Sequence, residues 1–276
     1  MTTEKISQPV TANLIQRRIE DLYLPPVAGF HSDAPSKLLG QLEEAVGIAR
    51  AEKKPLSVRV LVSSFDLTDL AESISALGFK KMYDRVEYIH PLDASIPDDA
   101  PQIKSANPAI SWVPGLKSYG MDELGAIYQK AALGDPSGVI PVDATPIDFR
   151  KDLEGDLSDS AFHHSAEAIQ IGLIDGQSAA FVFAQVMKQP NHPVTLEGKR
   201  TIEGWSRLAY LGILPEFRGH GYGRQVHRHG LRTLRAMGGL TYHGGTARDN
   251  ISMRRLFESS GCVVLRLLEE WKLPLI

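Results

Sequence analysis

The sequence predicts a mixed α/β fold, and three observations carry this prediction. Apolar residues recur at helical spacing over 124–131, which indicates a helix with one buried face. They alternate over 169–173, as in a strand that is buried on one face. A strand, a glycine-rich loop and a helix then follow one another over 208–237. Antiparallel strands followed by a strand–helix–strand unit place the chain in the mixed α/β class.

The elements of the C-terminal part can be predicted in order. Two helices are expected from residues at helical spacing: Leu124, Ile127, Tyr128 and Ala131, then Phe149, Leu153 and Leu157. A hairpin follows, because Asp175-Gly176 is a turn signal between two strands. One face of its second strand holds Phe181, Phe183, Gln185 and Met187. Later elements are a polar loop at 188–201, strands at 208–213, 240–246 and 262–273, and helices at 222–237 and 252–259.

The composition of the sequence indicates two domains and excludes some classes of protein. The segment 91–108 holds four prolines and three aspartates without apolar periodicity, so we expect a linker at 93–108 between domains 1–92 and 109–276. A net charge of -3 argues against a nucleic-acid binder, and one cysteine excludes a disulfide within the chain. No signal core and no membrane-spanning stretch is apparent, so we expect a cytoplasmic protein without a membrane partner.

The segment Arg218-Gly219-His220-Gly221-Tyr222-Gly223 is the most informative motif. It follows a strand and opens a helix, where unpaired N–H groups and a partial positive charge attract anions. Glycines allow the main chain to approach a phosphate closely, and Arg218, Arg224 and Arg228 add charge. A P-loop is rejected because Arg224-Gln225 replaces Lys-Ser/Thr, and a dinucleotide fingerprint does not fit. The remaining alternative is a glycine-rich turn without a ligand.

The stretch LAYLGILPEFRGHGYG, together with DNISMRRLFESSGC further on, resembles the acetyl-CoA signature of the GCN5-related N-acetyltransferases, the GNAT superfamily. The resemblance covers most of residues 110–275. It implies a splayed mixed β-sheet flanked by helices, with acetyl-CoA as co-substrate between two central parallel strands. It further implies that the main chain of Leu211 and Ile213 pairs with the pantetheine arm. Amides of Arg218, Gly219, His220, Gly221, Tyr222, Gly223 and Arg224 would hold the pyrophosphate, and Asn250 would lie beside the arm.

Acetyl transfer to an amine needs a proton acceptor, an oxyanion donor and a departing thiolate. The resemblance and the strand positions make Glu203, Tyr210 and His243 the candidate catalytic residues. In the family a Tyr often protonates the thiolate, but the matching position here is Phe257. The alternatives are that Ser252 or water donates the proton, or that the thiolate leaves without a donor. The pair Gly244-Gly245 either widens the acceptor pocket or marks a bulge. The histidines do not share faces at ligand spacing, so no metal is expected.

The first 92 residues resemble the back half of the same fold. A shift of 183 residues places Gly78 on Gly261 and aligns LGFKKMYDRVEYIHPL with SGCVVLRLLEEWKLPL, which share a Gly, a Glu and a final Pro-Leu. The same shift puts Pro35 on Arg218, so the phosphate cradle is lost in this copy. We expect a degenerate partial GNAT-like domain without coenzyme A, and an unrelated small α/β domain is the alternative.

The sequence therefore favours an acyl-CoA-dependent N-acetyltransferase acting on a primary amine of a small molecule or a protein. The alternative is a non-catalytic acyl-CoA-binding sensor or regulatory module, and a third reading is transfer to an alcohol or thiol. A homodimer is a possible assembly. The acceptor and the acyl length are open at this point.

Overall fold

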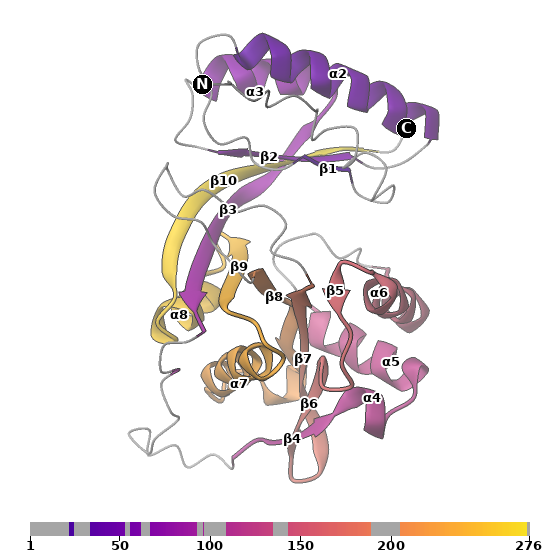
Figure 1. Ribbon diagram of the computed structural model, residues 1–276, viewed down its shortest axis with the longest axis vertical. Coiled ribbons are helices and arrows are strands. Elements are labelled where there is room, and N and C mark those ends of the chain that lie inside the picture. Colours follow the sequence, from indigo (N-terminus) through magenta and orange to yellow (C-terminus); the bar gives the residue numbers. More distant parts are fainter. Residues whose placement is uncertain are drawn as a thin grey trace, which may run out of the picture. The chain divides into compact units, whose positions relative to one another are not determined.

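The computed structural model describes residues 22–24, 34–52, 56–61, 67–92, 96, 109–134, 143–188 and 205–274. The chain forms two compact units: unit 1 comprises Met1–Arg85 with Arg266–Ile276, and unit 2 comprises Val86–Leu265. Figure 1 labels the elements. In chain order they are β1 (Leu22–Leu24), α2 (Ala34–Glu52), β2 (Leu56–Leu61), α3 (Leu67–Ala76), β3 (Lys80–Pro91), β4 (Ser111–Pro114), α4 (Gly115–Ser118), α5 (Met121–Ala132), α6 (Pro146–Ser158), β5 (Phe162–His163), β6 (Ile169–Ile174), β7 (Gln177–Met187), β8 (Trp205–Ile213), the 3-10 helix η1 (Pro215–Phe217), α7 (Gly223–Ala236), β9 (Thr241–Ala247), α8 (Ile251–Ser259) and β10 (Val263–Leu273).

The sheet of unit 2 is mixed, which confirms the predicted fold class. Its strands follow the order β9-β8-β7-β6-β4, with β3 on the other side of β9 and β5 paired to β7. The β8/β9 pair is parallel, whereas β4/β6, β5/β7, β6/β7 and β7/β8 are antiparallel. The helices and strands expected over 121–273 are all present, and the Asp175-Gly176 turn has left-handed φ angles of 50° and 77°.

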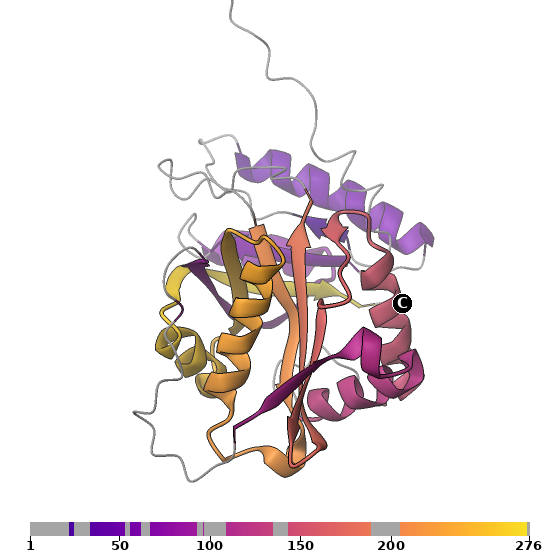
Figure 2. The same ribbon diagram turned by 60° about the horizontal axis from the view of Figure 1, so that its bottom comes forward.

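Helices cover both faces of this sheet. Along β7, Phe181 and Phe183 pack with the apolar residues of α5 and α6, and the intervening Val182 packs with α7. Figures 1 and 2 show α5 and α6 on one side of the strands and α7 on the other. Because both faces are buried, β7 is apolar over most of its length, with Gln185 as a polar exception on the α5/α6 face.

Local sequence fixes where the helices around the sheet begin. The Thr145 hydroxyl accepts from the Asp148 amide while the Asp148 carboxylate accepts from the Thr145 amide, with Pro146 at the first helical position of α6. These bonds to Thr145 hold the pKa of Asp148 below its usual value. Gly125 of α5 allows close packing with α6, since a Cβ there would lie 2.6 Å from the Pro146 carbonyl oxygen. The two helices therefore form one layer.

Unit 1 contains strand segments from both halves of the sequence. In it β1 and β2 are parallel, and the β10 residues Leu268–Leu273 pair antiparallel with β2. Arg85 of β3 lies 3.9 Å from Glu270 of β10. Conversely, the β3 residues Val86 and Tyr88 belong to the core of unit 2. The two compact units thus divide the chain inside β3 and β10, whereas the predicted boundary is the linker at 93–108, which lies outside the described residues except at Ile96.

The order of elements repeats along the chain. A shift of 183 residues maps β1, α2, β2, α3 and β3 onto β8, α7, β9, α8 and β10, with starts that agree within six residues. Gly78 and Gly261, which correspond under this shift, both have left-handed φ angles, at 96° and 84°. The matching order supports a degenerate first copy, and the domain assignment stays a prediction.

Candidate active site

The sheet of unit 2 opens between its two parallel central strands. β8 and β9 pair at Trp205↔Thr241 and Ser206↔Tyr242, and they do not pair farther along the described parts of the two strands. From Arg207 to Ile213 every β8 residue is half-buried, although a central strand is ordinarily buried like β7 beside it. The main-chain groups of β8 that face β9 are therefore available to a ligand in this part of the sheet.

A β-bulge lies in β8 at the start of the opening. Phe183 of β7 pairs with Tyr210 and the next residue, Ala184, pairs with Leu208, so Ala209 is the extra residue. A bulge leaves one residue unpaired and changes the direction of the groups beside it, and bulges are frequent beside active sites. The Ala209 amide is thus a candidate oxyanion donor. Sequence reasoning missed it, because Leu208-Ala209-Tyr210 carries no glycine or other bulge signal.

The loop after β8 forms an anion cradle. Gly219 and Gly221 have φ angles of 80° and 81°, and Tyr222 is in the right-handed helical region. Alternation of this kind turns successive amides toward one concavity. No atom lies within 4 Å of a Cβ built on Gly219 or Gly221, so the concavity is open to a ligand. α7 follows with no acidic residue in its first turn and no side-chain cap. These features fit a pyrophosphate.

The arginines near this loop have different roles. Arg218 donates from Nε to the Ile213 carbonyl at 2.8 Å, and from its two terminal nitrogens to Leu133 at 2.6 Å and Ala131 at 3.0 Å. Its guanidinium therefore ties the end of β8 to the end of α5, which corrects the expectation that its charge faces phosphate. Arg228 is buried and donates to the Ser259 carbonyl at 3.1 Å. Arg224 makes no hydrogen bond or ion pair within the described residues.

We predict that Arg218→Ala lowers the free energy of unfolding by about 1–2 kcal/mol, because three hydrogen bonds to main-chain carbonyls are lost at a partly solvated site. Urea denaturation of the variant and wild type measures this difference. An unchanged unfolding midpoint combined with a large loss of acetyl-CoA affinity would instead show that the guanidinium contacts the ligand.

The other predicted coenzyme-binding residues divide between main-chain and structural roles. Leu211 and Ile213 lie on β8 along the opening, as expected. Tyr222 is buried against Val226, so its side chain belongs to the core and only its main chain can contribute. His220 is exposed in the loop. The Asn250 Oδ1 accepts from the Met253 amide at 3.1 Å and caps α8. The side chain that was expected beside the pantetheine arm is therefore engaged in capping this helix. Gly223 packs against Leu256.

The three candidate bases are in different situations. Glu203 lies outside the described residues. The Tyr210 hydroxyl donates to the Ala131 carbonyl at 3.2 Å, and its ring packs on Tyr128, so it serves packing. His243 is the first β9 residue beyond the last β8/β9 pair, and its Nε2 lies 3.1 Å from Glu87 Oε2 of β3. Among the described candidates, His243 is the one that lies at the opening and has an orienting carboxylate.

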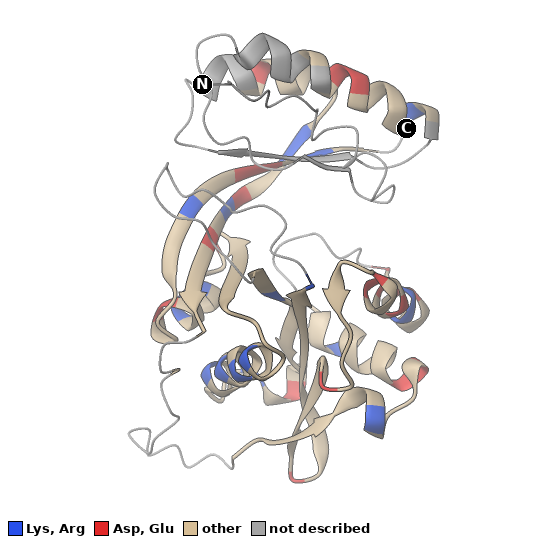
Figure 3. Cartoon of the chain, in the orientation of Figure 1, with Lys and Arg blue, Asp and Glu red and all other residues tan. Residues whose placement is uncertain are grey.

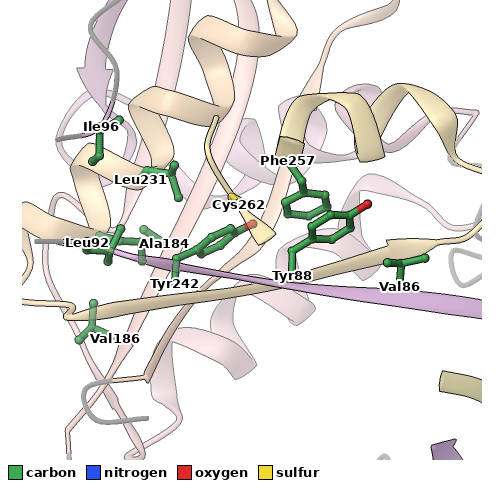
Figure 4. Packing of buried hydrophobic residues seen from close by; sticks show 11 residues of the cluster. Val86, Tyr88, Leu92, Ile96, Ala184, Val186, Leu231, Tyr242, Phe257 and Cys262 are labelled. Carbon is green, nitrogen blue, oxygen red and sulfur yellow. The ribbon is translucent and has the colours of Figure 1, made fainter. Parts of the chain in front are cut away.

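The place of the family's tyrosine is occupied by a buried aromatic stack. Phe257 is 1% exposed and stacks on Tyr88 of β3, with ring centroids 4.4 Å apart (Figure 4). The Tyr88 hydroxyl lies 3.4 Å from Glu258 Oε1 and 3.4 Å from Arg254 Nε. Phe257 therefore supplies packing and no proton, while Ser252, the alternative donor, is exposed in the first turn of α8.

The aromatic rings of Tyr242 and Phe257 leave no room for a side chain at position 244. A Cβ on it would lie 2.7 Å from Cε1 of Phe257 and closer still to the Tyr242 hydroxyl, so the close approach in β9 is to side chains. We predict that Gly244→Ala lowers the free energy of unfolding by about 1–3 kcal/mol through overpacking. Gly155→Ala is the matched control, because no atom lies within 4 Å there and α6 gains about 0.5–1 kcal/mol. Thermal unfolding of both variants tests this, and a Gly244→Ala protein as stable as wild type would contradict it.

A buried histidine supports β9 from the α7 side. His227 Nδ1 lies 2.8 Å from Ser260 Oγ, and Nε2 lies 3.4 Å from the Tyr242 hydroxyl. Burial, with the nearby charges of His90 and Arg228, lowers the pKa of His227 to about 3. The described residues contain no group of three or more His, Cys, Asp and Glu side chains that could hold a metal. No helix in the described ranges is long and apolar enough to cross a membrane.

An open splayed sheet with a glycine nest at the start of α7 agrees with the arrangement that the resemblance to the GNAT superfamily implies. A sequence model of the acetyltransferase (GNAT) family matches residues 143–262. Residues 143–262 of the chain therefore match the GNAT family. A comparison with curated proteins finds no match.

Solved structures show the same fold at low sequence identity. A GCN5-related N-acetyltransferase from Sphaerobacter thermophilus is 14% identical with a TM-score of 0.52, and the match covers 86% of this chain and 66% of that one. A tandem GNAT protein from the clavulanic acid biosynthesis pathway is 15% identical with a TM-score of 0.52, over 84% and 68% of the two chains. A protein of unknown function from Staphylococcus epidermidis is 11% identical with a TM-score of 0.53, over 99% and 94%. The chain thus spans about two thirds of the length of the first two.

Proposed function

We propose that the protein is an acyl-CoA-dependent N-acetyltransferase that moves an acetyl group from acetyl-CoA to a primary amine of a small molecule or a protein. The observation that carries this proposal is the opening between β8 and β9, which runs along Leu211 and Ile213 toward the Gly219–Gly221 cradle. The family and the fold support acyl transfer in general, and the acetyl donor and amine acceptor are the specific parts of the proposal.

The donor fits the opening by hydrogen bonding and charge. Pantetheine has amide groups spaced along an extended chain, so it can pair with the unpaired side of β8 as a strand does. The cradle amides and the start of α7 then meet the pyrophosphate, with Arg224 as an available cation. Figure 3 shows that Lys and Arg positions recur along the backbone of α7, which gives this helix a basic character.

The reaction centre falls where β8 and β9 separate. A thioester placed there has the Ala209 bulge beside its carbonyl oxygen and His243 on the other strand. The bulge amide stabilises the oxyanion, and His243 accepts a proton from the amine. Holding thioester and amine together supplies much of the remaining rate.

A sensor or regulatory module that binds acyl-CoA without transfer is the second candidate. The observation that favours it is the buried Phe257, which supplies no proton to the departing thiolate. Release of thiol distinguishes the two functions.

The test is release of coenzyme A from acetyl-CoA with a panel of primary amines: hexylamine, phenethylamine, glucosamine and a lysine-containing peptide. We expect enzyme-dependent thiol release with at least one amine and a product heavier by one acetyl group in mass spectrometry. Acetyl-CoA binding in calorimetry without thiol release from any amine would support the sensor and contradict the transferase.

A further inference from the structure

Glu87 and His243 form a buried acid–base pair at the opening. Glu87 Oε2 lies 3.1 Å from His243 Nε2, and the Glu87 side chain is 1% exposed while that of His243 is 13% exposed. A buried carboxylate accepts hydrogen bonds, so the Nε2 hydrogen of His243 points to Glu87. This arrangement leaves a lone pair on Nδ1, which makes no hydrogen bond within the described residues.

The pair lies on the face of the sheet that α5 and α6 cover. The His243 ring is 5.5 Å from that of Trp205, and Arg207 is two residues farther along the same face of β8. Arg207 donates to Gln185 Oε1 at 2.7 Å and lies 3.8 Å from Asp156 of α6. Tyr242 and Phe257 are on the opposite face, where α7 and α8 pack.

We propose that Glu87, supplied by β3, positions His243 as the general base that takes the proton from the acceptor amine. The inference rests on the proposed N-acetyltransferase function. Glu87 lies before the segment that the family model matches, so the N-terminal half of the chain completes the active site of unit 2. A base whose tautomer is fixed by a carboxylate recurs in nucleophilic enzymes, where the carboxylate also stabilises the protonated ring.

The proton balance of the step is complete. The acceptor arrives as an ammonium ion and gives one proton to Nδ1 of His243. The neutral amine attacks the thioester carbon, the C–S bond breaks, and the coenzyme A thiolate takes the second proton of the amine directly or through water. Protonated His243 then releases its proton to solvent, so acetyl-CoA and ammonium ion give amide, thiol and one proton. Glu87 neither gains nor loses a proton in these steps.

The test compares Glu87→Gln, His243→Gln and the double variant in the coenzyme A release assay with an accepted amine. In Glu87→Gln the introduced side-chain amide can donate to Nε2 of His243 and place the ring hydrogen on Nδ1, where it blocks the base. We expect kcat to fall about 100-fold or more in His243→Gln and roughly 10-fold or more in Glu87→Gln, with KM nearly unchanged. The double variant should be no slower than His243→Gln, because both residues act in one step.

Glu258→Gln is the matched control. It makes the same charge change, and Glu258 meets Tyr88 on the other face of β3, so kcat should stay at the wild-type value. Acetyl-CoA affinity measured by calorimetry should be the same in all variants. If wild type transfers acetyl groups and both single variants keep wild-type kcat, the role of Glu87 is refuted and the proposed function stands. If wild type releases no thiol with any amine, the proposed function fails and the inference fails with it.

Discussion

Gly221→Glu is expected to abolish acetyl-CoA binding. Gly221 has a φ angle of 81° and no atom within 4 Å of an added Cβ, so a side chain there extends into the space proposed for the pyrophosphate. The carboxylate would face phosphate at a helix start that ordinarily attracts anions. We expect a loss of about 3 kcal/mol or more in binding free energy, roughly a hundredfold or more in Kd, measured by calorimetric titration.

Gly238→Glu is the control that distinguishes a loss of acetyl-CoA binding caused by the new carboxylate from one caused by backbone strain. Gly238 also has a left-handed φ angle, 89°, and open space around an added Cβ, but it follows the other end of α7. Both variants should therefore lose similar stability, and Gly238→Glu should bind acetyl-CoA as wild type does. Equal binding by Gly221→Glu and wild type would contradict the cradle.

Protonation of His227 is expected to destabilise the fold in acid. Its pKa is lowered to about 3, first by burial and then by His90 and Arg228, whereas a histidine in the unfolded chain titrates near pH 6.5. Below that pH the unfolded state binds a proton that the folded state does not, so stability is present above pH 6.5 and is lost as the pH falls toward 3. The slope approaches about 1.4 kcal/mol per pH unit, or about 3 kcal/mol by pH 4.

His227→Asn provides the comparison, because its amide can still bond to Ser260 but does not titrate. The variant should be less stable than wild type at pH 7, since a smaller side chain leaves a cavity beside Tyr242. Its unfolding free energy, measured with urea from pH 7 to pH 4, should fall less steeply than that of wild type. The same slope in both proteins would contradict a neutral buried His227.

The sequence predicts much of this fold because its local signals agree with one another. Helical spacing over 124–131, the Asp175-Gly176 turn and the strand-to-helix glycines each describe short-range geometry, which the chain keeps in the structure. The turn of the glycine loop into α7 was predictable for the same reason, since alternate glycines before a helix determine where amides point. The correspondence of Gly78 with Gly261 under the 183-residue shift was also predicted, and both glycines have left-handed φ angles.

Features that depend on distant pairing were not predictable. The bulge at Ala209 arises from the register of β8 against β7, and the side-chain bonds of Arg218 depend on where α5 ends. The Glu87–His243 contact joins residues 156 positions apart. One signal for Glu87 did exist: under the 183-residue shift it is the glutamate that the two aligned segments share, opposite Glu270. That signal has no functional meaning until the structure shows that β3 lies beside β9.

The central claim, that acetyl-CoA binds in the opening of β8 and β9, is tested most directly by amide hydrogen exchange with and without acetyl-CoA. The account predicts slower exchange in peptides that cover 207–213 and 218–225, because pantetheine pairs with β8 and the pyrophosphate accepts from the loop amides. Slower exchange confined to unit 1, or unchanged exchange in both peptides at saturating acetyl-CoA, would contradict it.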